Sequence, residues 1–329
     1  MNRNLLTDVP GLRVGNAEDA KLASGVTTIV FDEPAVTSAD VRGGAPGTRD
    51  IDLLQPDETV ERIDAVVLSG GSAFGLDAPT GVQAWLREQG RGFAIGPVVV
   101  PIVPGAIVFD LLNGGNKDWG RFPPYRDLGY AAAAGAAYDF ALGNTGAGLG
   151  ATTVNLKGGL GSASTTTRDG AIVGAIVIVN AVGSVTVGDG PHFWAAPFER
   201  NGEFGGRGLP PTMPPDALDI RLKGGARENT TIALVATDAT LTKAQAKRLA
   251  TVAHDGLARA IYPVHTPLDG DVVFAASTCK GTAPDLMAFA ELGALAANVL
   301  SRAVARAVYE ASALPFPGAL PGWKEKFGA

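Results

Sequence analysis

The feature that most constrains this chain is a series of short runs rich in Val and Ile, each bounded by Gly or Asp. Such runs have the length and composition of buried β-strands. They cover Val26–Phe31, Asp64–Leu68, Ala171–Val179, Ser184–Val187, Thr231–Ala236 and Asp271–Ala276. Helical patterns lie between and after them, so the sequence predicts an α/β protein with substantial sheet.

Three segments have the pattern of helices. Ser72–Gln89 follows a strand and stops at Gly90, a residue suited to a helix C-terminus. Thr242 and Gln245 form a capping box, which opens a helix whose apolar residues are spaced three and four apart. A long Ala-rich helix is expected over Pro284–Ala311, where small residues suit close packing on a sheet.

Composition narrows the classes of function. The 329 residues are 46% hydrophobic, enough for one large domain or two small ones, and the net charge of −6 argues against nucleic-acid binding. The start of the chain lacks an apolar signal region and no uninterrupted apolar run reaches membrane-spanning length, so a soluble cytoplasmic protein is expected. One cysteine and three histidines without ligand spacing predict no metal or other cofactor.

Two glycine-rich motifs have ordinary interpretations. Gly146-Ala-Gly148-Leu-Gly-Ala151 fits a dinucleotide-binding pattern, but the segment before it reads as helix and the segment after it is no helix start. Ser69-Gly-Gly-Ser72 lies between a strand and a helix, yet it does not match the serine-hydrolase motif. We interpret the second as a tight turn with Ser72 as the N-cap.

A long segment rich in Pro and Gly, Pro191–Glu228, predicts an irregular loop that ends directly before Asn229-Thr230-Thr231. On its own, Asn-Thr before a strand is usually only a turn. If the Asn229–Thr230 bond is cut, however, the new α-amine of Thr230 can serve as the base for its own hydroxyl. Asp269 and Asp271 lie at the entrance of the last strand. By spacing alone, they are more typical of an Asp-Gly turn than of a functional site built from two carboxylates.

Taken together, several segments resemble the DmpA-type aminopeptidases, a family that includes β-peptidyl aminopeptidases, L-aminopeptidase/D-esterases and nylon-oligomer hydrolases. The matching blocks span nearly the whole chain. They are Asp40–Ala45, Leu68–Leu76, Pro101–Asp110, Gly146–Gly148, Lys157–Ser162, Ala175–Asn180, Asn229–Ile232 and His265–Asp271. The resemblance implies a four-layer αββα sandwich over residues 1–329 that cuts itself into 1–229 and 230–329. It also implies assembly as a tetramer or larger ring.

The resemblance also implies roles for individual residues. Thr230 corresponds to the nucleophile, and Asp269 and Asp271 match an acidic pair of the nylon-oligomer hydrolase branch. Lys157 and Asn180 match polar residues of the family's site, with Asn180 as an oxyanion-hole amide. Phe109 stands where several members have a Tyr near the substrate, so this chain lacks that hydroxyl.

The expected activity is hydrolysis of peptides or amide oligomers, including 6-aminohexanoate oligomers, that carry a free amino group. Carboxylates at the mouth of the site would receive that amine. Two alternatives remain at this point. One is acyl transfer of the ornithine-acetyltransferase kind, and the other is a binding scaffold without catalytic activity.

Overall fold

The computed structural model describes residues 3–223 and 229–328. Nine strands in it join into one hydrogen-bonded sheet in the order β3-β7-β4-β2-β11-β10-β9-β8, with β1 beside β2. The strands are β1 (Leu12–Asp19), β2 (Ser24–Val41), β3 (Thr48–Arg49), β4 (Arg62–Ser69), β7 (Gly105–Ile107), β8 (Gly159–Thr166), β9 (Ile172–Asn180), β10 (Thr230–Thr237) and β11 (Val272–Ser277). A separate hairpin joins β5 (Phe93–Ile95) and β6 (Val98–Val100).

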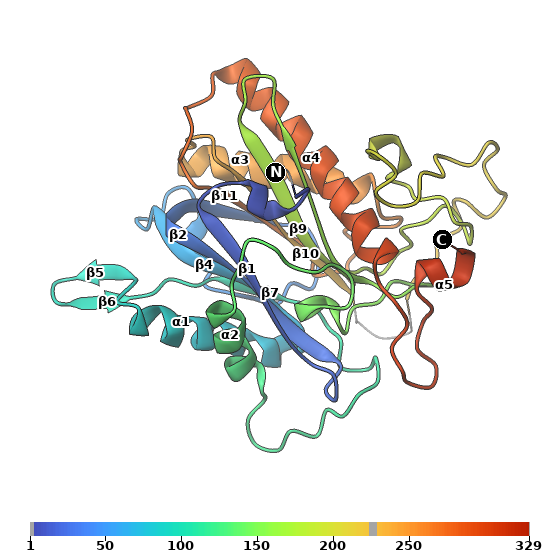
Figure 1. Cartoon of the computed structure of the whole chain (residues 1–329), viewed down its shortest axis with the longest axis horizontal. Helices are drawn as coiled ribbons and strands as arrows, with labels where there is room; N and C mark the ends of the chain where they lie inside the picture. Colours follow the sequence, from blue (N-terminus) through green and yellow to red (C-terminus); the bar gives the residue numbers. More distant parts are fainter. Residues whose placement is uncertain (1–2, 224–228, 329) are drawn as a thin grey trace.

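The long strand β2 turns this sheet into two layers. Its first part pairs with β1 and β4, and its last part, from Val36 to Val41, pairs with β11. The register against β4 shifts between Val30 and Ala35, and such an irregularity bends a strand. The half built around β4 therefore packs face to face on the half built from β8 to β11 (Figure 1).

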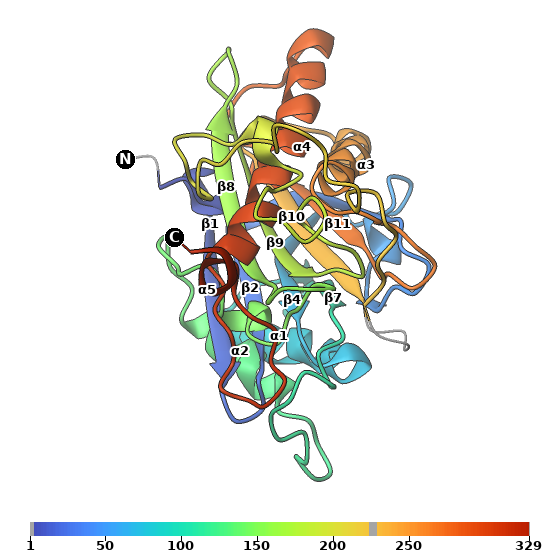
Figure 2. The same cartoon turned by 90° about the vertical axis from the view of Figure 1, so that its right-hand side faces the viewer.

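Helices cover the two outer faces. The α-helices are α1 (Ala78–Glu88), α2 (Tyr125–Ala134), α3 (Lys243–Ala258), α4 (Leu286–Tyr309) and α5 (Trp323–Phe327). Short 3-10 turns are η1 (Leu6–Asp8), η2 (Asp52–Leu54), η3 (Ser72–Asp77), η4 (Gly146–Gly148) and η5 (Ala196–Phe198). α3 and α4 lie on the β8–β11 half, whereas α1 and α2 lie on the half that contains β1, β2 and β4 (Figures 1 and 2).

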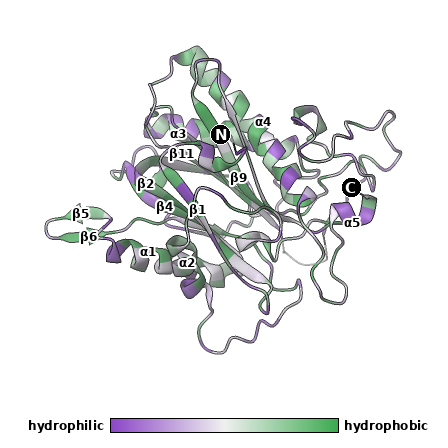
Figure 3. Ribbon diagram, viewed as in Figure 1, coloured by the Kyte–Doolittle hydropathy of each residue, from purple (hydrophilic) through white to green (hydrophobic). Residues whose placement is uncertain are grey.

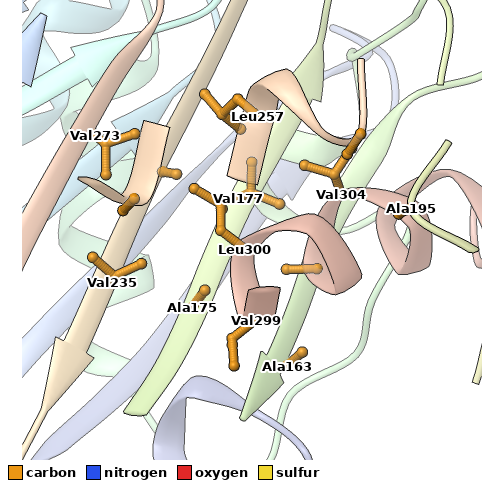
Figure 4. Close-up of a cluster of buried hydrophobic side chains, with 14 of the residues drawn as sticks. Ala163, Ala175, Val177, Ala195, Val235, Leu257, Val273, Val299, Leu300 and Val304 are labelled. Atoms are coloured by element: carbon orange, nitrogen blue, oxygen red, sulfur yellow. The ribbon is translucent and has the colours of Figure 1, made fainter. Parts of the chain in front are cut away.

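Alternation along the strands separates the hydrophobic core into layers. On β9, Ala175 and Val177 face α3 and α4, and Figure 4 shows them beside Leu257 and Leu300. Ile176 and Ile178, on the opposite face of the same strand, pack between the two sheet halves. A third cluster lies under α1 and α2. The predicted αββα sandwich is therefore confirmed.

α4 is long and apolar enough, by composition, to cross a membrane, but 56% of its most apolar window is buried in the protein. Its small residues allow close contact with β8, as expected for a core helix. The β5–β6 hairpin, by contrast, projects from the body and exposes apolar side chains, among them Ile95 at 62% and Val98 at 56% (Figure 3).

Most predicted elements are present, with three corrections. Ser184–Val187 is not a strand: it makes only isolated bridges, from Ser184 to Tyr262 and from Thr186 to Phe193. The helix expected from Ser72 begins as the 3-10 turn η3, and α1 starts only at Ala78. Ser72 is not the N-cap of either element, because Gly71 occupies that position in η3 and Asp77 in α1.

Candidate active site

Thr230 is the first residue of β10 and lies opposite Asn180, the last residue of β9. Its side chain is buried, and its Oγ1 is 2.5 Å from the carbonyl oxygen of Asn229. The backbone N–H of Gly270 donates to that same carbonyl oxygen at 3.0 Å. The peptide bond between Asn229 and Thr230 thus has a hydroxyl on one side and a hydrogen-bond donor on its oxygen.

The two aspartates lie directly beside this peptide bond. Asp271 accepts the backbone N–H of Thr231 at 2.7 Å. Asp269 accepts both the N–H and the hydroxyl of Thr266 at 2.8 Å, and the N–H of Val182 at 3.4 Å. Both carboxylates are only 1% exposed. Their contacts are therefore with the protein, and neither lies at the mouth of the site where the sequence analysis placed an amine-binding role.

The environment of Asp269 shifts the pKa of its carboxyl group. Burial, and then the negative charge of Asp271, raise the pKa of Asp269 to about 6. The hydrogen bonds from Thr266 and Val182 oppose the shift without cancelling it. Asp269 therefore changes its protonation near pH 6, well above the range of an exposed Asp.

His265 also belongs to this cluster, although the sequence alone assigned it no specific role in the site. Its Nδ1 is 2.8 Å and its backbone N 3.2 Å from Asp271 Oδ2. Its ring meets that of His254 edge to face at 4.8 Å, and His254 Nε2 lies 3.0 Å from the carbonyl oxygen of Asp40. Burial lowers the pKa of His254 to about 4, so this ring is neutral at pH 7. His265 thus contacts Asp271 directly, and His254 packs against His265.

Lys157 is fully buried beneath the site. Its Nζ donates to the carbonyl oxygens of Gly148, Ala151 and Gly158 at 3.0, 2.7 and 2.8 Å. Burial, and then the positive charge of Lys223, lower the pKa of Lys157 to about 7. The resemblance placed Lys157 among the polar residues of the site, and these three hydrogen bonds of its ammonium group go to backbone carbonyls. Two of these carbonyls, those of Gly148 and Ala151, belong to the glycine-rich segment Gly146–Ala151 that fits the dinucleotide-binding pattern.

Asn180 links Thr230 to the rest of the site. Its Nδ2 donates to the carbonyl oxygen of Phe109 at 3.0 Å. Its Oδ1 accepts the N–H of Thr152 at 3.0 Å and the Nζ of Lys223 at 2.9 Å. Lys223 was not foreseen, because it lies in the Pro- and Gly-rich loop and belongs to no motif. The end of that loop, residues 224–228, lies outside the described residues.

A cavity of about 360 Å³ opens beside this amide group. It is lined by Phe109, Asp110, Leu112, Asn113, Gly114, Thr152, Lys157, Lys223, Leu314 and residues 317–320. Phe109 therefore faces the cavity, as its assignment to substrate binding requires. Asp110 is buried in the wall and accepts the hydroxyl of Ser24 at 2.6 Å and the N–H of Gly71 at 2.8 Å. Burial raises the pKa of Asp110.

The structure thus brings Thr230, Asn180, Asp269 and Asp271 together at one end of the central strands. Phe109 and Lys157 lie around the adjoining cavity. Within the part of the chain that the structure describes, no group of three or more His, Cys, Asp or Glu side chains is placed to hold a metal ion.

The comparisons with known proteins identify a hydrolase of amide bonds. The model of Peptidase family S58 matches residues 4–318, and the chain belongs to that family.

Individual relatives agree with this assignment. An uncharacterized aminopeptidase of Mycobacterium tuberculosis is 42% identical over 98% of both chains. A 6-aminohexanoate-oligomer endohydrolase of Kocuria sp. is 28% identical over 82% of this chain and 74% of that protein. The solved structure of a Burkholderia sp. beta-aminopeptidase has a TM-score of 0.74 at 23% identity, covering 98% of this chain and 90% of that one, and so shares its fold.

Proposed function

We propose that this hydrolase activates itself by cutting the Asn229–Thr230 bond and then uses Thr230 as its nucleophile. The hydroxyl oxygen of Thr230 attacks the carbonyl carbon of Asn229, and the hydroxyl proton passes to the departing backbone nitrogen. The resulting ester is hydrolysed by water, which leaves a carboxylate on Asn229 and a free α-amine on Thr230.

The observation that carries this proposal is the geometry at the bond itself. Thr230 Oγ1 lies 2.5 Å from the Asn229 carbonyl oxygen, so the hydroxyl is held beside the group that it must attack. The N–H of Gly270, 3.0 Å from that oxygen, is placed to stabilise the negative charge that develops there. One such donor is typically worth about 3–4 kcal/mol of barrier.

In the processed enzyme the α-amine of Thr230 is the base for its own hydroxyl, because its pKa, about 7.7–8.0 for an ordinary α-amine, suits neutral pH. Asn180 supports the oxyanion of the substrate through its Nδ2. Asp271, which accepts the neighbouring N–H of Thr231, and Asp269 hold the new amino terminus in place. Lys157 fixes three carbonyls behind the cavity, and Phe109 contacts the substrate.

The substrates that we propose are small peptides or amide oligomers whose acyl part carries a free amino group. The names of the relatives support this class, since they are aminopeptidases and a 6-aminohexanoate-oligomer endohydrolase. As an assembly we propose a homotetramer of processed protomers, which analytical ultracentrifugation measures directly.

The test is substitution of the nucleophile. Wild-type protein should give two bands on a denaturing gel, and sequencing of the smaller should start Thr-Thr-Ile-Ala. Thr230→Ala should remain a single chain and hydrolyse neither an amino-acid p-nitroanilide nor a β-alanyl amide. Thr230→Ser, which keeps a hydroxyl, should still split. Cleavage of Thr230→Ala at the same bond would rule Thr230 out as the agent.

A further inference from the structure

Lys223 forms part of the wall of the cavity in the uncleaved chain. It donates to Asn180 Oδ1 at 2.9 Å and to the carbonyl oxygen of Thr152 at 3.3 Å. Lys223 precedes the Asn229–Thr230 bond by only a few residues and contributes to the cavity lining. A cation from the segment before the cleavage point is thus bound by two oxygen acceptors in the candidate site.

These acceptors would suit any primary ammonium. An amide oxygen and a backbone carbonyl oxygen accept N–H donors, and an ammonium has three to give. The neighbouring wall contains Leu112 and Leu314, which suit an apolar stem behind the charge. The positive charge of Lys223 acts on Lys157, whose pKa is already lowered by burial. Burial therefore favours the neutral form of Lys157. A second cation can therefore be accommodated beside it.

We propose that Lys223 occupies, in the uncleaved chain, the subsite that binds the free amine of the substrate in the processed enzyme. The inference rests on the proposed function, because that function supplies both the cleavage and an amine-bearing substrate. Cutting the Asn229–Thr230 bond leaves Lys223 close to a new carboxyl end, so its ammonium can leave Asn180 and Thr152. The oxygens of those two residues then receive the amine of the substrate.

This location also restricts the length of the substrate's acyl group. Asn180 would bind the ammonium through Oδ1 and the oxyanion through Nδ2, which are two atoms of one small amide. The amine and the reacting carbonyl must then lie close together. An α- or β-amino acyl group meets this condition, whereas a 6-aminohexanoyl group would have to fold its long spacer back. The subsite therefore favours α- and β-amino acyl amides.

Binding to the uncleaved chain tests the subsite without requiring turnover. We would titrate β-alaninamide by calorimetry into Thr230→Ala and into Thr230→Ala/Lys223→Met, with intact mass verifying that each remains one chain. Hydrogen bonds to a charged group are worth enough that removing the Lys223 ammonium should tighten β-alaninamide binding about tenfold or more. Binding of N-acetyl-β-alaninamide, which has no ammonium, should not change. Thr230→Ala/Lys223→Arg keeps the charge and should bind as weakly as Thr230→Ala.

Two results would overturn the proposal. One is unchanged affinity for β-alaninamide in the Lys223→Met variant. The other is an equal gain in affinity for the acetylated compound, which would mean that the substitution only enlarged the cavity. Tighter binding of 6-aminohexanamide than of β-alaninamide would overturn the preference for short acyl groups. Failure of the proposed function would look different: wild-type protein would not split, or Thr230→Ala would.

Discussion

Space around the Thr230 hydroxyl decides whether it can reach its target, and Gly270 provides that space. A Cβ on Gly270 would lie 2.7 Å from Thr230 Oγ1 and 2.7 Å from the carbonyl oxygen of Ala45. The backbone N–H of Gly270 also donates to the Asn229 carbonyl oxygen, so this residue touches both reacting groups. Sequence reasoning treated Gly270 only as a turn residue between two aspartates.

Gly270→Ala should therefore slow self-cleavage by about 10²-fold, because a displacement near 1 Å of a reacting atom costs about that much. The measurement is the half-time of conversion from one band to two after purification of freshly made protein. Gly293→Ala in α4 is the matched control, since its nearest neighbour would be Val252 Cγ1 at an ordinary 3.4 Å. Equal half-times for the two variants would contradict the role of Gly270.

His265 is expected to position Asp271 rather than to touch the substrate. His265→Leu removes the 2.8 Å contact from Nδ1 to Asp271 Oδ2 and should lower kcat about tenfold, with a smaller change in KM. His265→Asn should restore much of the loss, because Asn tolerates the φ of +55° and its amide can donate from a similar place. Steady-state kinetics on fully processed protein checks this. If both variants lose activity equally, the ring itself is required.

The raised pKa of Asp269 should make the free energy of unfolding depend on pH. The folded chain holds this proton more tightly than the unfolded chain, whose value is 3.8, so ionisation costs stability as pH rises from about 4 to about 6. Asp269→Asn removes that dependence. The unfolding free energy of Thr230→Ala minus that of Thr230→Ala/Asp269→Asn should fall by about 1–3 kcal/mol across this window. Denaturant titrations at several pH values measure it, and a flat difference would contradict the shift.

For individual residues, the sequence predicted which side chains belong to the candidate site but not which groups they contact. Thr230, Asn180, Asp269, Asp271 and Lys157 do gather in one region. Which groups they hold depends on neighbours far away in the chain. Two of the three carbonyls that accept from Lys157 belong to Gly148 and Ala151, in a different segment, and the contribution of His265 depends on the fold around Asp271.

At the scale of elements, periodicity predicted the buried strands and long helices well, because apolar side chains mark both. It missed β8, whose residues Gly159–Thr166 are small and partly polar. The reason is close packing: a Cβ on Gly161 would come within 1.9 Å of the Ala303 carbonyl oxygen of α4. Small residues are required where the helix lies against the strand, and they carry no strand signal of their own.

The short helix α5 was also missed, and its contribution can be measured. Trp323 is 1% exposed and stacks on Phe193 with ring centroids 5.5 Å apart. It lies three residues after Leu320, the last of residues 317–320 that line the cavity. Trp323→Ala should lower the free energy of unfolding by about 3–5 kcal/mol, as for other large buried aromatics.

A matched control separates the loss of packing from the loss of an aromatic ring as such. Phe122 is 74% exposed, so Phe122→Ala should change the free energy of unfolding by less than about 0.5 kcal/mol. Urea denaturation of both variants in the Thr230→Ala background, where the chain stays whole, provides the comparison. Similar losses in the two variants would mean that α5 does not pack as described.

For the whole molecule, the consequence of the proposed self-cleavage depends on where the cut would lie in the sheet. β10 lies between β9 and β11, and β11 pairs with β2, so residues 230–329 enter the sheet between strands of residues 1–229. Apolar side chains from both parts share the layer between the sheet halves, including Leu234 and Phe274 with Ile29 and Ile176. Exposing each of these would cost about 1.5–3 kcal/mol.

The two products should therefore remain one folded particle after cleavage. On size-exclusion chromatography without denaturant they should elute together in equal amounts, at the volume of the single-chain Thr230→Ala protein, and separate only in strong denaturant. Because unfolding of the cut protein releases two chains, its unfolding midpoint should rise with protein concentration more steeply than that of Thr230→Ala. Elution of the 230–329 fragment by itself under native conditions would show that the shared sheet does not hold the halves together.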